Sequence, residues 1–258
     1  MKSIELTNAD LYENGNIGVP LLKWFPLFFL VITPFALYLD SVAFTKAYFD
    51  LRWLVNISVL VFFCIFYYVS DFQLRKLMLV MVPLSYLGEW IFSKWFGWYT
   101  YRLEEIPMYV PFGHAIVYGS GYVVAGYKTV IKHELPFRKF FSIAFILLFV
   151  GVAIGLEDYF SGILGVLFFW LIYRKKWQNL YFLIALCVIY IELWGTWFGC
   201  WAWEAKIGGV LPTINPPMGA VFLYGGGDVL LARIVKRWNR YLAKKDLFII
   251  HLKFIQIR

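Results

Sequence analysis

The sequence predicts an all-α membrane protein: a polytopic bundle of about eight transmembrane helices, built from two parallel four-helix repeats. Three observations predict this fold class. The first is composition, because 62% of the 258 residues are hydrophobic, 22% are aromatic and the mean hydropathy is +0.69, which leaves too little polar material to coat a soluble globule. The second is a series of long apolar segments. The third is a group of motifs that occurs twice.

Eight apolar segments approach the ~20 residues that a helix needs to cross the hydrocarbon core of a bilayer. They cover residues 22–39, 53–70, 76–96, 108–127, 140–156, 160–173, 180–198 and 214–235. The first twenty residues are polar and lack the basic-then-apolar pattern of a cleavable signal, so we expect the first span to remain in the membrane. Each segment is therefore a predicted transmembrane helix.

Lysines and arginines gather on one side of the predicted membrane. If the N-terminus is cytoplasmic, the inner side receives most of them, including all those from Arg233 onward. The outer side receives only Lys46, Arg52, Lys94, Arg102 and Lys206. This positive-inside pattern predicts a multi-pass protein of the cell (inner) membrane with both termini cytoplasmic. The net charge of +8 therefore reflects topology, and we expect no nucleic-acid partner.

A group of short motifs occurs once in each half of the chain. The first copy contains Glu89, Phe96-Gly97, Pro111-x-Gly113 and Tyr118-Gly-x-Gly121, and the second contains Glu192, Phe198-Gly199, Pro217-x-Gly219 and Tyr224-Gly-x-Gly227. Four spans separate equivalent positions, and an even number gives both halves the same orientation. We therefore predict a parallel repeat about an axis near the membrane normal, in contrast to the inverted repeats of many transporters.

These patterns divide the chain into five predicted parts. They are a cytoplasmic N-terminal segment (1–20), a first four-helix repeat (21–127), a basic cytoplasmic linker (128–139), a second four-helix repeat (140–235) and a basic amphipathic C-terminal tail (236–258). Apolar residues interleave with the charges of the tail. This favours an amphipathic segment on an anionic inner leaflet over a nucleic-acid-binding arm.

Two glutamates of the repeated motifs lie within predicted spans. Glu89 is thirteen residues after Lys76, and Glu192 is thirteen after Asn179, which places both carboxyls roughly 20 Å from the inner surface at the helical rise. His114 reaches nearly the same layer from the outer side. Because a charged group at the centre of a membrane helix costs about 2.5–3.5 kcal/mol, we expect these groups to face the protein interior.

We predict that Glu89, Glu192 and His114 are catalytic residues. The alternative for the glutamates is structural, as neutral or hydrogen-bonded acids that tie helices together. For His114 the alternative is a satisfied interior histidine, since the second copy has Ala220 at that position. The three cysteines show no paired spacing, so they indicate neither a disulfide framework nor a zinc site, and we expect no metal.

Aromatic residues around the motifs are candidates for substrate binding. The predicted binding residues are Trp95, Trp98, Tyr101, Tyr118, Trp197, Trp201, Trp203, Tyr224 and, in an outer connection, Asn215. The alternative for the tryptophans and tyrosines is the aromatic belt at the outer interface. The motif glycines favour close helix contact. Asp228, in the last span, is either a second polar position or a partner for Arg233.

The second copy of the motifs carries a family resemblance. Glu192-x-x-Gly195-Thr196, followed by Phe198-Gly199-x-Trp201-x-Trp203, resembles the Glu-x-x-Gly-Thr and Phe-Gly-x-Tyr-x-Tyr pattern of the CruF-type carotenoid biosynthesis (carotenoid hydratase) membrane proteins. The first copy is similar but lacks the Gly-Thr. The resemblance covers about a third of the chain, with fewer residues between the Glu and the Phe-Gly. It implies a multi-helix membrane protein that hydrates a terminal isoprenoid double bond by acid catalysis.

Acid catalysis suits the two predicted glutamates. Protonating an unactivated alkene needs a positioned acid in a dry apolar pocket, where burial favours the proton-carrying form of a carboxyl group. We therefore predict a membrane enzyme, a lyase or an isomerase, that hydrates, cyclises or isomerises a double bond of an apolar isoprenoid- or carotenoid-like lipid without a cofactor. Aromatic ring faces would stabilise the carbocation. The expected partners are membrane lipid and this substrate.

Two other classes of function use the same residues. A proton- or cation-coupled membrane carrier would bind its ion at the paired glutamates, but it needs an aqueous route from both sides, and only Asp228 continues the polar layer inward. A non-catalytic membrane component that binds lipids or partners is the third class. The sequence indicates neither the identity of the substrate nor the oligomeric state.

Overall fold

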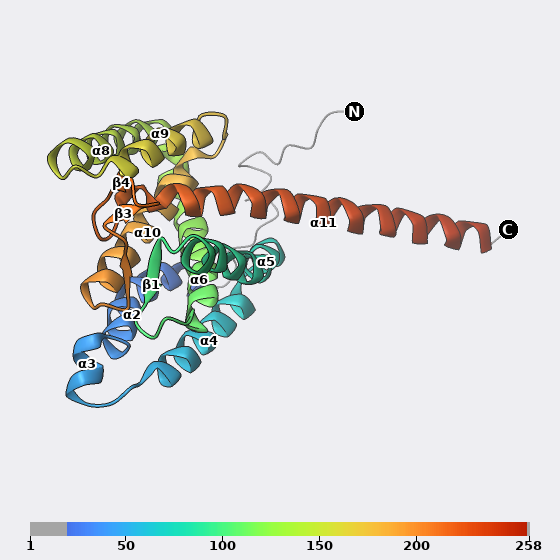
Figure 1. Ribbon diagram of the computed structural model, residues 1–258. Helices are drawn as coiled ribbons and strands as arrows, with labels where there is room; N and C mark the ends of the chain where they lie inside the picture. Colours follow the sequence, from blue (N-terminus) through green and yellow to red (C-terminus); the bar gives the residue numbers. More distant parts are fainter. Residues whose placement is uncertain (1–19, 257–258) are drawn as a thin grey trace.

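The computed structural model describes residues 20–256 (Figure 1). Its helices are α2 (Phe25–Leu39), α3 (Val42–Ala47), α4 (Arg52–Val69), α5 (Phe72–Glu89), α6 (Tyr109–Ala125), α7 (Lys128–Lys132), α8 (Glu134–Gly155), α9 (Tyr159–Tyr173), α10 (Gln178–Trp197) and α11 (Val221–Gln256). Short helical turns, η1 (Pro20–Trp24) and η3 (Met218–Ala220), precede α2 and α11, and a π-helical turn, η2 (Trp90–Trp95), follows α5. The all-α class is confirmed. The predicted segment 1–20 lies outside the described residues apart from Pro20.

Five of the described helical segments are long and apolar enough to cross a membrane. They are Pro20–Leu39, Arg52–Val69, Glu134–Gly155, Gln178–Trp197 and Met218–Leu242, and the apolar helix Tyr159–Tyr173 is shorter. The remaining two predicted spans are also helical. However, α5 carries Arg75, Lys76 and Glu89, and α6 has only 17 residues. That all eight helices cross a membrane therefore stays a prediction.

Several element boundaries differ from those predicted, and two of them change the predicted division of the chain. The linker 128–139 is largely helical, because α8 begins at Glu134 and holds Pro136 in its first turn, where the missing N–H of proline breaks no helical hydrogen bond. At the other end, α11 continues past the predicted boundary at Val235 because no glycine or proline follows Gly227. The side chains of the predicted tail beyond residue 242, and hence its amphipathic face, lie outside the described residues.

Helices α5, α6 and α10 and the first part of α11 form the centre of the molecule, and the rest of α11 extends away from it (Figure 1). Helix α6 packs against both α5 and α10, and α11 packs against the same two helices, so the two halves of the chain interlock. Gly121 permits close contact between α6 and α10. A Cβ atom at this position would lie 2.5 Å from Cγ1 of Ile184 and 3.2 Å from its backbone.

A short antiparallel ladder joins the two halves. Strand β1 (Tyr99–Tyr101) pairs with β2 (Trp201–Trp203), so that Tyr99 faces Trp203 and Tyr101 faces Trp201. Each strand begins two residues after a glycine with positive φ, Gly97 at 62° and Gly199 at 68°, where other residues are strained. A second small sheet pairs β3 (Lys206–Ile207) with β4 (Leu211–Pro212). None of these strands was predicted from the sequence, because two or three residues give too short a pattern.

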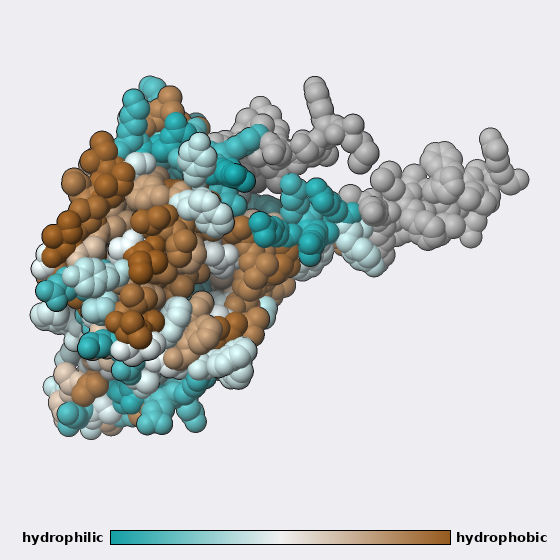
Figure 2. All heavy atoms as spheres, turned by 45° about the horizontal axis from the view of Figure 1, so that its top comes forward, coloured by the Kyte–Doolittle hydropathy of each residue, from teal (hydrophilic) through white to brown (hydrophobic). Residues whose placement is uncertain are grey.

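Hydrophobic side chains cover much of the face shown in Figure 2. Hydrophilic residues gather where α11 leaves the body of the molecule and at the opposite, lower end of that view. Large apolar residues are exposed on α2, α4, α8 and α9, among them Phe35, Tyr68, Ile154 and Trp170. A soluble monomer rarely exposes so much apolar surface, so this distribution is that expected of helices in contact with lipid.

Candidate active site

A cavity of about 410 Å³ lies among α2, α4, α5, α6, α10 and α11. Residues of the β1–β2 ladder also line it. Most of the lining is apolar, with side chains such as Val55, Val117 and Ile184. Ligand sites commonly occupy roughly 300–1,000 Å³, so this cavity can hold a small lipid or one end of a longer lipid. Both predicted glutamates line it.

Glu89 is the last residue of α5, and only 5% of its surface is exposed. Its Oε1 atom lies 2.8 Å from Nε2 of His114 on α6. Its Oε2 atom accepts hydrogen bonds from the hydroxyl groups of Tyr99 at 2.6 Å and Tyr101 at 2.5 Å. Glu89 and His114 thus form a hydrogen-bonded pair that is able to hold and transfer a proton.

Glu192 lies in α10, and only 4% of its surface is exposed. Its Oε2 atom accepts hydrogen bonds from the indole N–H groups of Trp201 at 2.8 Å and Trp203 at 3.1 Å. The hydroxyl group of Tyr224 on α11 donates to Oε1 at 3.1 Å. Every polar partner recorded for Glu192 in the described part of the chain is uncharged. A carboxyl group without a neighbouring cation has its lowest free-energy cost of burial as the neutral acid.

The two carboxyl groups are held in matching ways. Alternate residues of a strand point to the same face, so both tyrosines of β1 reach one oxygen of Glu89, and both tryptophans of β2 reach one oxygen of Glu192. The other oxygen of each faces a side chain of the following helix, His114 or Tyr224. The rings of His114 and Tyr224 stack with their centroids 4.7 Å apart, which joins the two acid sites.

The π-helical turn Trp90–Trp95 explains how the first half keeps this arrangement. Gly97 is the eighth residue after Glu89, whereas Gly199 is the seventh after Glu192, so the first copy contains one extra residue. A π turn takes up an extra residue because its hydrogen bonds span five residues instead of four. Both strands therefore start in equivalent positions relative to their glutamates.

Gly195 makes room for one of the donors to Glu192. A Cβ atom on Gly195 would lie 1.9 Å from Cη2 of Trp201 and 2.1 Å from Cζ2, so the Gly195→Ala variant must displace the indole that donates to Glu192. We expect this variant to lose about 1–3 kcal/mol of unfolding free energy, measured by thermal unfolding in detergent. The matched control is Gly151→Ala on α8, where a Cβ meets nothing within 4 Å. Equal unfolding temperatures for the two variants would contradict the packing described here.

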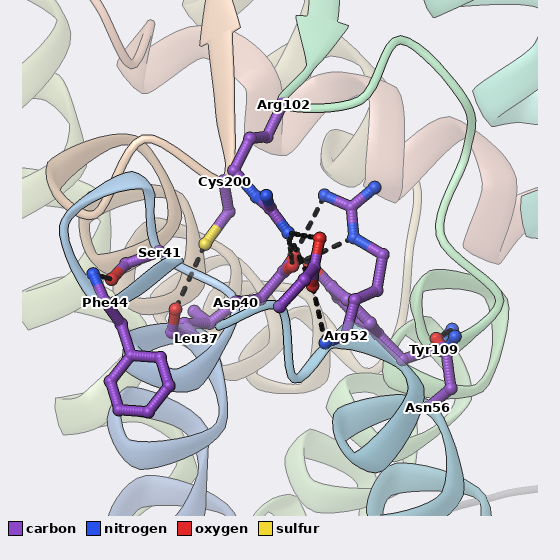
Figure 3. A network of polar contacts seen from close by, with 10 residues as sticks. Leu37, Asp40, Ser41, Phe44, Arg52, Asn56, Arg102, Tyr109 and Cys200 are labelled. Atoms are coloured by element: carbon purple, nitrogen blue, oxygen red, sulfur yellow. Dashed lines mark hydrogen bonds and ion pairs between the residues drawn. The ribbon is translucent and has the colours of Figure 1, made fainter. Parts of the chain in front are cut away.

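A charge cluster of Asp40, Asp50, Arg52, Arg102 and Tyr109 lies beside the ladder (Figure 3). Asp40 follows α2 and is fully buried. It accepts hydrogen bonds from Nε of Arg52, Nη2 of Arg102 and the hydroxyl group of Tyr109, each at 2.8 Å. Asp50 accepts from the same Arg102 nitrogen at 3.0 Å but is partly exposed.

This cluster fixes the ladder relative to α2. The backbone N–H of Arg102 donates to the carbonyl of Cys200 at 2.9 Å, and Sγ of Cys200 lies 3.2 Å from the carbonyl oxygen of Leu37. Burial alone would raise the pKa of Asp50, but hydrogen bonds from the backbone of Arg52 and from Arg102 lower it overall. The two arginines therefore favour the ionised form of Asp50.

The structure brings most of the predicted site residues to the cavity. The residues that line it are Glu89, Tyr101, His114, Tyr118, Glu192, Trp201, Trp203 and Tyr224. Asn215 does not line the cavity, but its side-chain oxygen accepts the backbone N–H of Trp203 at 3.1 Å. Three tryptophans do not reach it: Trp95 and Trp197 are 69% and 82% exposed, and Trp98 packs between Phe92 and Phe160.

Several residues of the site were not predicted from the sequence. Tyr99 stands in the Phe-Gly-x-Tyr-x-Tyr motif, and the two-residue spacing that marks a strand face would have paired it with Tyr101. Asp40 and Tyr109 had no such signal, because they come from segments 69 residues apart. Arg52 and Arg102 were assigned only to the outer side.

Among the described side chains, which end at residue 242, no group of three or more histidine, cysteine, aspartate or glutamate residues is arranged to hold a metal ion. Comparison with known proteins adds no relative, since no protein-family model, curated protein or solved structure matches the chain. The function must therefore be argued from the cavity itself.

Proposed function

We propose that this chain is a membrane enzyme that protonates a carbon–carbon double bond of an apolar isoprenoid-like lipid. The observation that carries the proposal is the pair of buried carboxyl groups in one largely apolar cavity. One of them pairs with a histidine, and the other accepts hydrogen bonds from uncharged groups. These two environments suit a proton acceptor and a proton donor, respectively.

Glu192 is the proposed acid. Its Oε2 atom is held by two indole N–H groups. In the proposal, Oε1 carries the proton toward the cavity and also accepts the hydrogen bond from the hydroxyl group of Tyr224. In the proposed step the π electrons of the alkene form a new C–H bond with this proton, Glu192 becomes a carboxylate, and the neighbouring carbon becomes a carbocation. The indole donors then stabilise the new negative charge.

The Glu89–His114 pair is the proposed base. In hydration, a water molecule forms a C–O bond with the carbocation and gives a proton to this pair, and the product is an alcohol heavier by one water molecule. In isomerisation or cyclisation, the pair accepts a proton from a carbon atom instead, and nothing is added. Ring faces of the ladder residues Tyr99 and Trp201, which line the cavity, would stabilise the cation by cation–π attraction.

The proposal includes the eight-span topology. We infer that all eight helices cross the cell (inner) membrane, that both termini are cytoplasmic, and that the chain is a parallel repeat of two four-helix units. The equivalent contacts of Glu89 and Glu192, and the positive-φ glycine before each strand, support the repeat. Basic residues on the inner connections support the orientation.

Expression in a host that makes carotenoids and other isoprenoids tests this function. The extracted lipids are separated, and their molecular masses are measured by mass spectrometry. A host with an empty vector is the control. The expected result is a new isoprenoid, either heavier than its precursor by one water molecule or of equal mass with altered absorbance. An unchanged set of isoprenoids in a host that contains the folded protein would argue against the proposal.

A proton- or cation-coupled carrier is the second candidate. The observation that favours it is Asp228, an additional buried acid that lines the same cavity as the two glutamates. Purified protein in liposomes distinguishes the candidates. A carrier would acidify or alkalinise the lumen when a cation gradient is applied, whereas the enzyme would leave the lumenal pH unchanged.

A further inference from the structure

Asp228 is a buried acid in the cavity that the proposed reaction does not use. It lies in α11, only 4% of its surface is exposed, and it lines the cavity. Its Oδ2 atom has no hydrogen-bond partner. Of the two alternatives for Asp228, pairing with Arg233 is not seen: Arg233 is exposed, and no ion pair joins the two residues in the described part of the chain. The residue therefore lines the cavity, and one of its carboxyl oxygens has unused hydrogen-bonding capacity.

The position of Asp228 relative to the glutamates is set by helix geometry. Asp228 is four residues after Tyr224, the residue that donates to Glu192, so it lies on the same face of α11, about 6 Å further along the axis. Tyr118 stands in the same relation to His114 on α6 and also lines the cavity. A ligand that extends along these helices would reach both the glutamate layer and Asp228.

An unpaired buried carboxyl group destabilises a protein, so a ligand that supplies the missing donor would be favoured. The apolar walls suit a hydrocarbon chain, and they disfavour an ammonium group because its charge would have to leave water. A hydroxyl group can donate one hydrogen bond without carrying a charge.

We propose that Asp228 binds the hydroxyl group of the lipid, so that the substrate class is an isoprenoid alcohol. Its hydroxyl group lies at Asp228, and the double bond that reacts lies one helical turn away, beside Glu192. This assignment rests on the proposed function for the position of the double bond. The binding of the hydroxyl group is independent of it.

Ligand binding to the purified full-length protein tests the inference. Tritiated geranylgeraniol is the probe, and the hydrocarbon of the same carbon skeleton without the hydroxyl group competes with it, with empty detergent micelles as the blank. The wild type is expected to bind the alcohol at least about tenfold more tightly than the hydrocarbon. The Asp228→Leu variant is expected to bind both equally, with the affinity for the hydrocarbon unchanged.

Two further variants keep the test decisive. Glu105→Leu, which removes an exposed loop acid, is expected to retain the preference for the alcohol. If Asp228→Leu does not fold, Asp228→Asn replaces it in the test. This variant keeps the shape of the side chain and is expected to reduce the preference for the alcohol. We also expect Asp228→Leu to unfold at a higher temperature than the wild type, because it removes an unpaired buried acid.

Equal affinity of the wild type for the two ligands would overturn the inference, and so would an unchanged preference in the folded Asp228 variants. Failure of the proposed function gives a different result. If no isoprenoid is converted but the preference for the alcohol still depends on Asp228, the hydroxyl site stands and the catalytic proposal falls. If a lipid without a hydroxyl group is converted and the alcohol is not, the catalytic proposal stands and the hydroxyl site falls.

Discussion

Glu192→Gln is expected to lower product formation by at least about 100-fold and to leave the protein folded. Glutamine has the shape of glutamate, and its amide oxygen can still accept the indole N–H groups of Trp201 and Trp203. It has no acidic proton to give to an alkene. The measurement is the amount of new isoprenoid per folded protein in the expressing host, with thermal unfolding as the test of folding.

Glu89→Gln is the companion variant. It breaks the pair with His114, so it is expected to remove the base that accepts the second proton and to stop turnover as well. Glu105→Gln, in an exposed outer loop, is the matched control and should keep full activity. Full activity in both Glu89→Gln and Glu192→Gln would reject the catalytic assignment.

Asp40→Ala is expected to destabilise the protein by about 3–5 kcal/mol. The substitution leaves the guanidinium groups of Arg52 and Arg102 buried beside each other without their shared acid. It also removes the acceptor for the Tyr109 hydroxyl group. The measurement is the shift in the thermal unfolding of purified protein in detergent.

Asp50→Ala is the matched control for this prediction. The side chain of Asp50 is 39% exposed, and exposed ion pairs contribute about 0–1 kcal/mol. We therefore expect a small shift for Asp50→Ala and a large one for Asp40→Ala. Similar unfolding temperatures for the two variants would mean that the charge cluster does not hold the ladder against α2.

The helices were predictable because membrane helices carry a strong local signal. Long apolar runs marked the eight longer helices, although boundaries moved, as at Glu134 and beyond Val235. The short helices α3 and α7 were not predicted. The meeting of Glu89, His114 and Glu192 in one cavity followed from the repeated motifs and from the cost of a charge in lipid. Sequence position and helical rise predicted a common depth for all three, and the structure places them around one cavity.

Contacts between distant segments were beyond the sequence. The ladder depends on two glycines with positive φ and on a register between strands of three residues, which is too short for a periodic pattern. Asp40 and Arg102 are 62 residues apart in the sequence, yet their side chains form a hydrogen bond. Not all of the tryptophans predicted to bind substrate line the cavity. The same residue type suits a cavity wall, as at Trp201, and an exposed surface, as at Trp197.

Infrared spectroscopy of the purified protein tests the central claim most directly, because a protonated carboxyl group has a C=O stretch separate from the bands of a carboxylate. The claim is that Glu192 carries the transferable proton in the shared cavity, while Glu89 is ionised beside His114. At neutral pH we predict a carboxylic-acid absorption that decreases in Glu192→Gln and persists in Glu89→Gln. Asp228→Asn is measured as well, to account for the third acid that lines the cavity. An absorption that decreases in Glu89→Gln and is unchanged in Glu192→Gln would contradict the account.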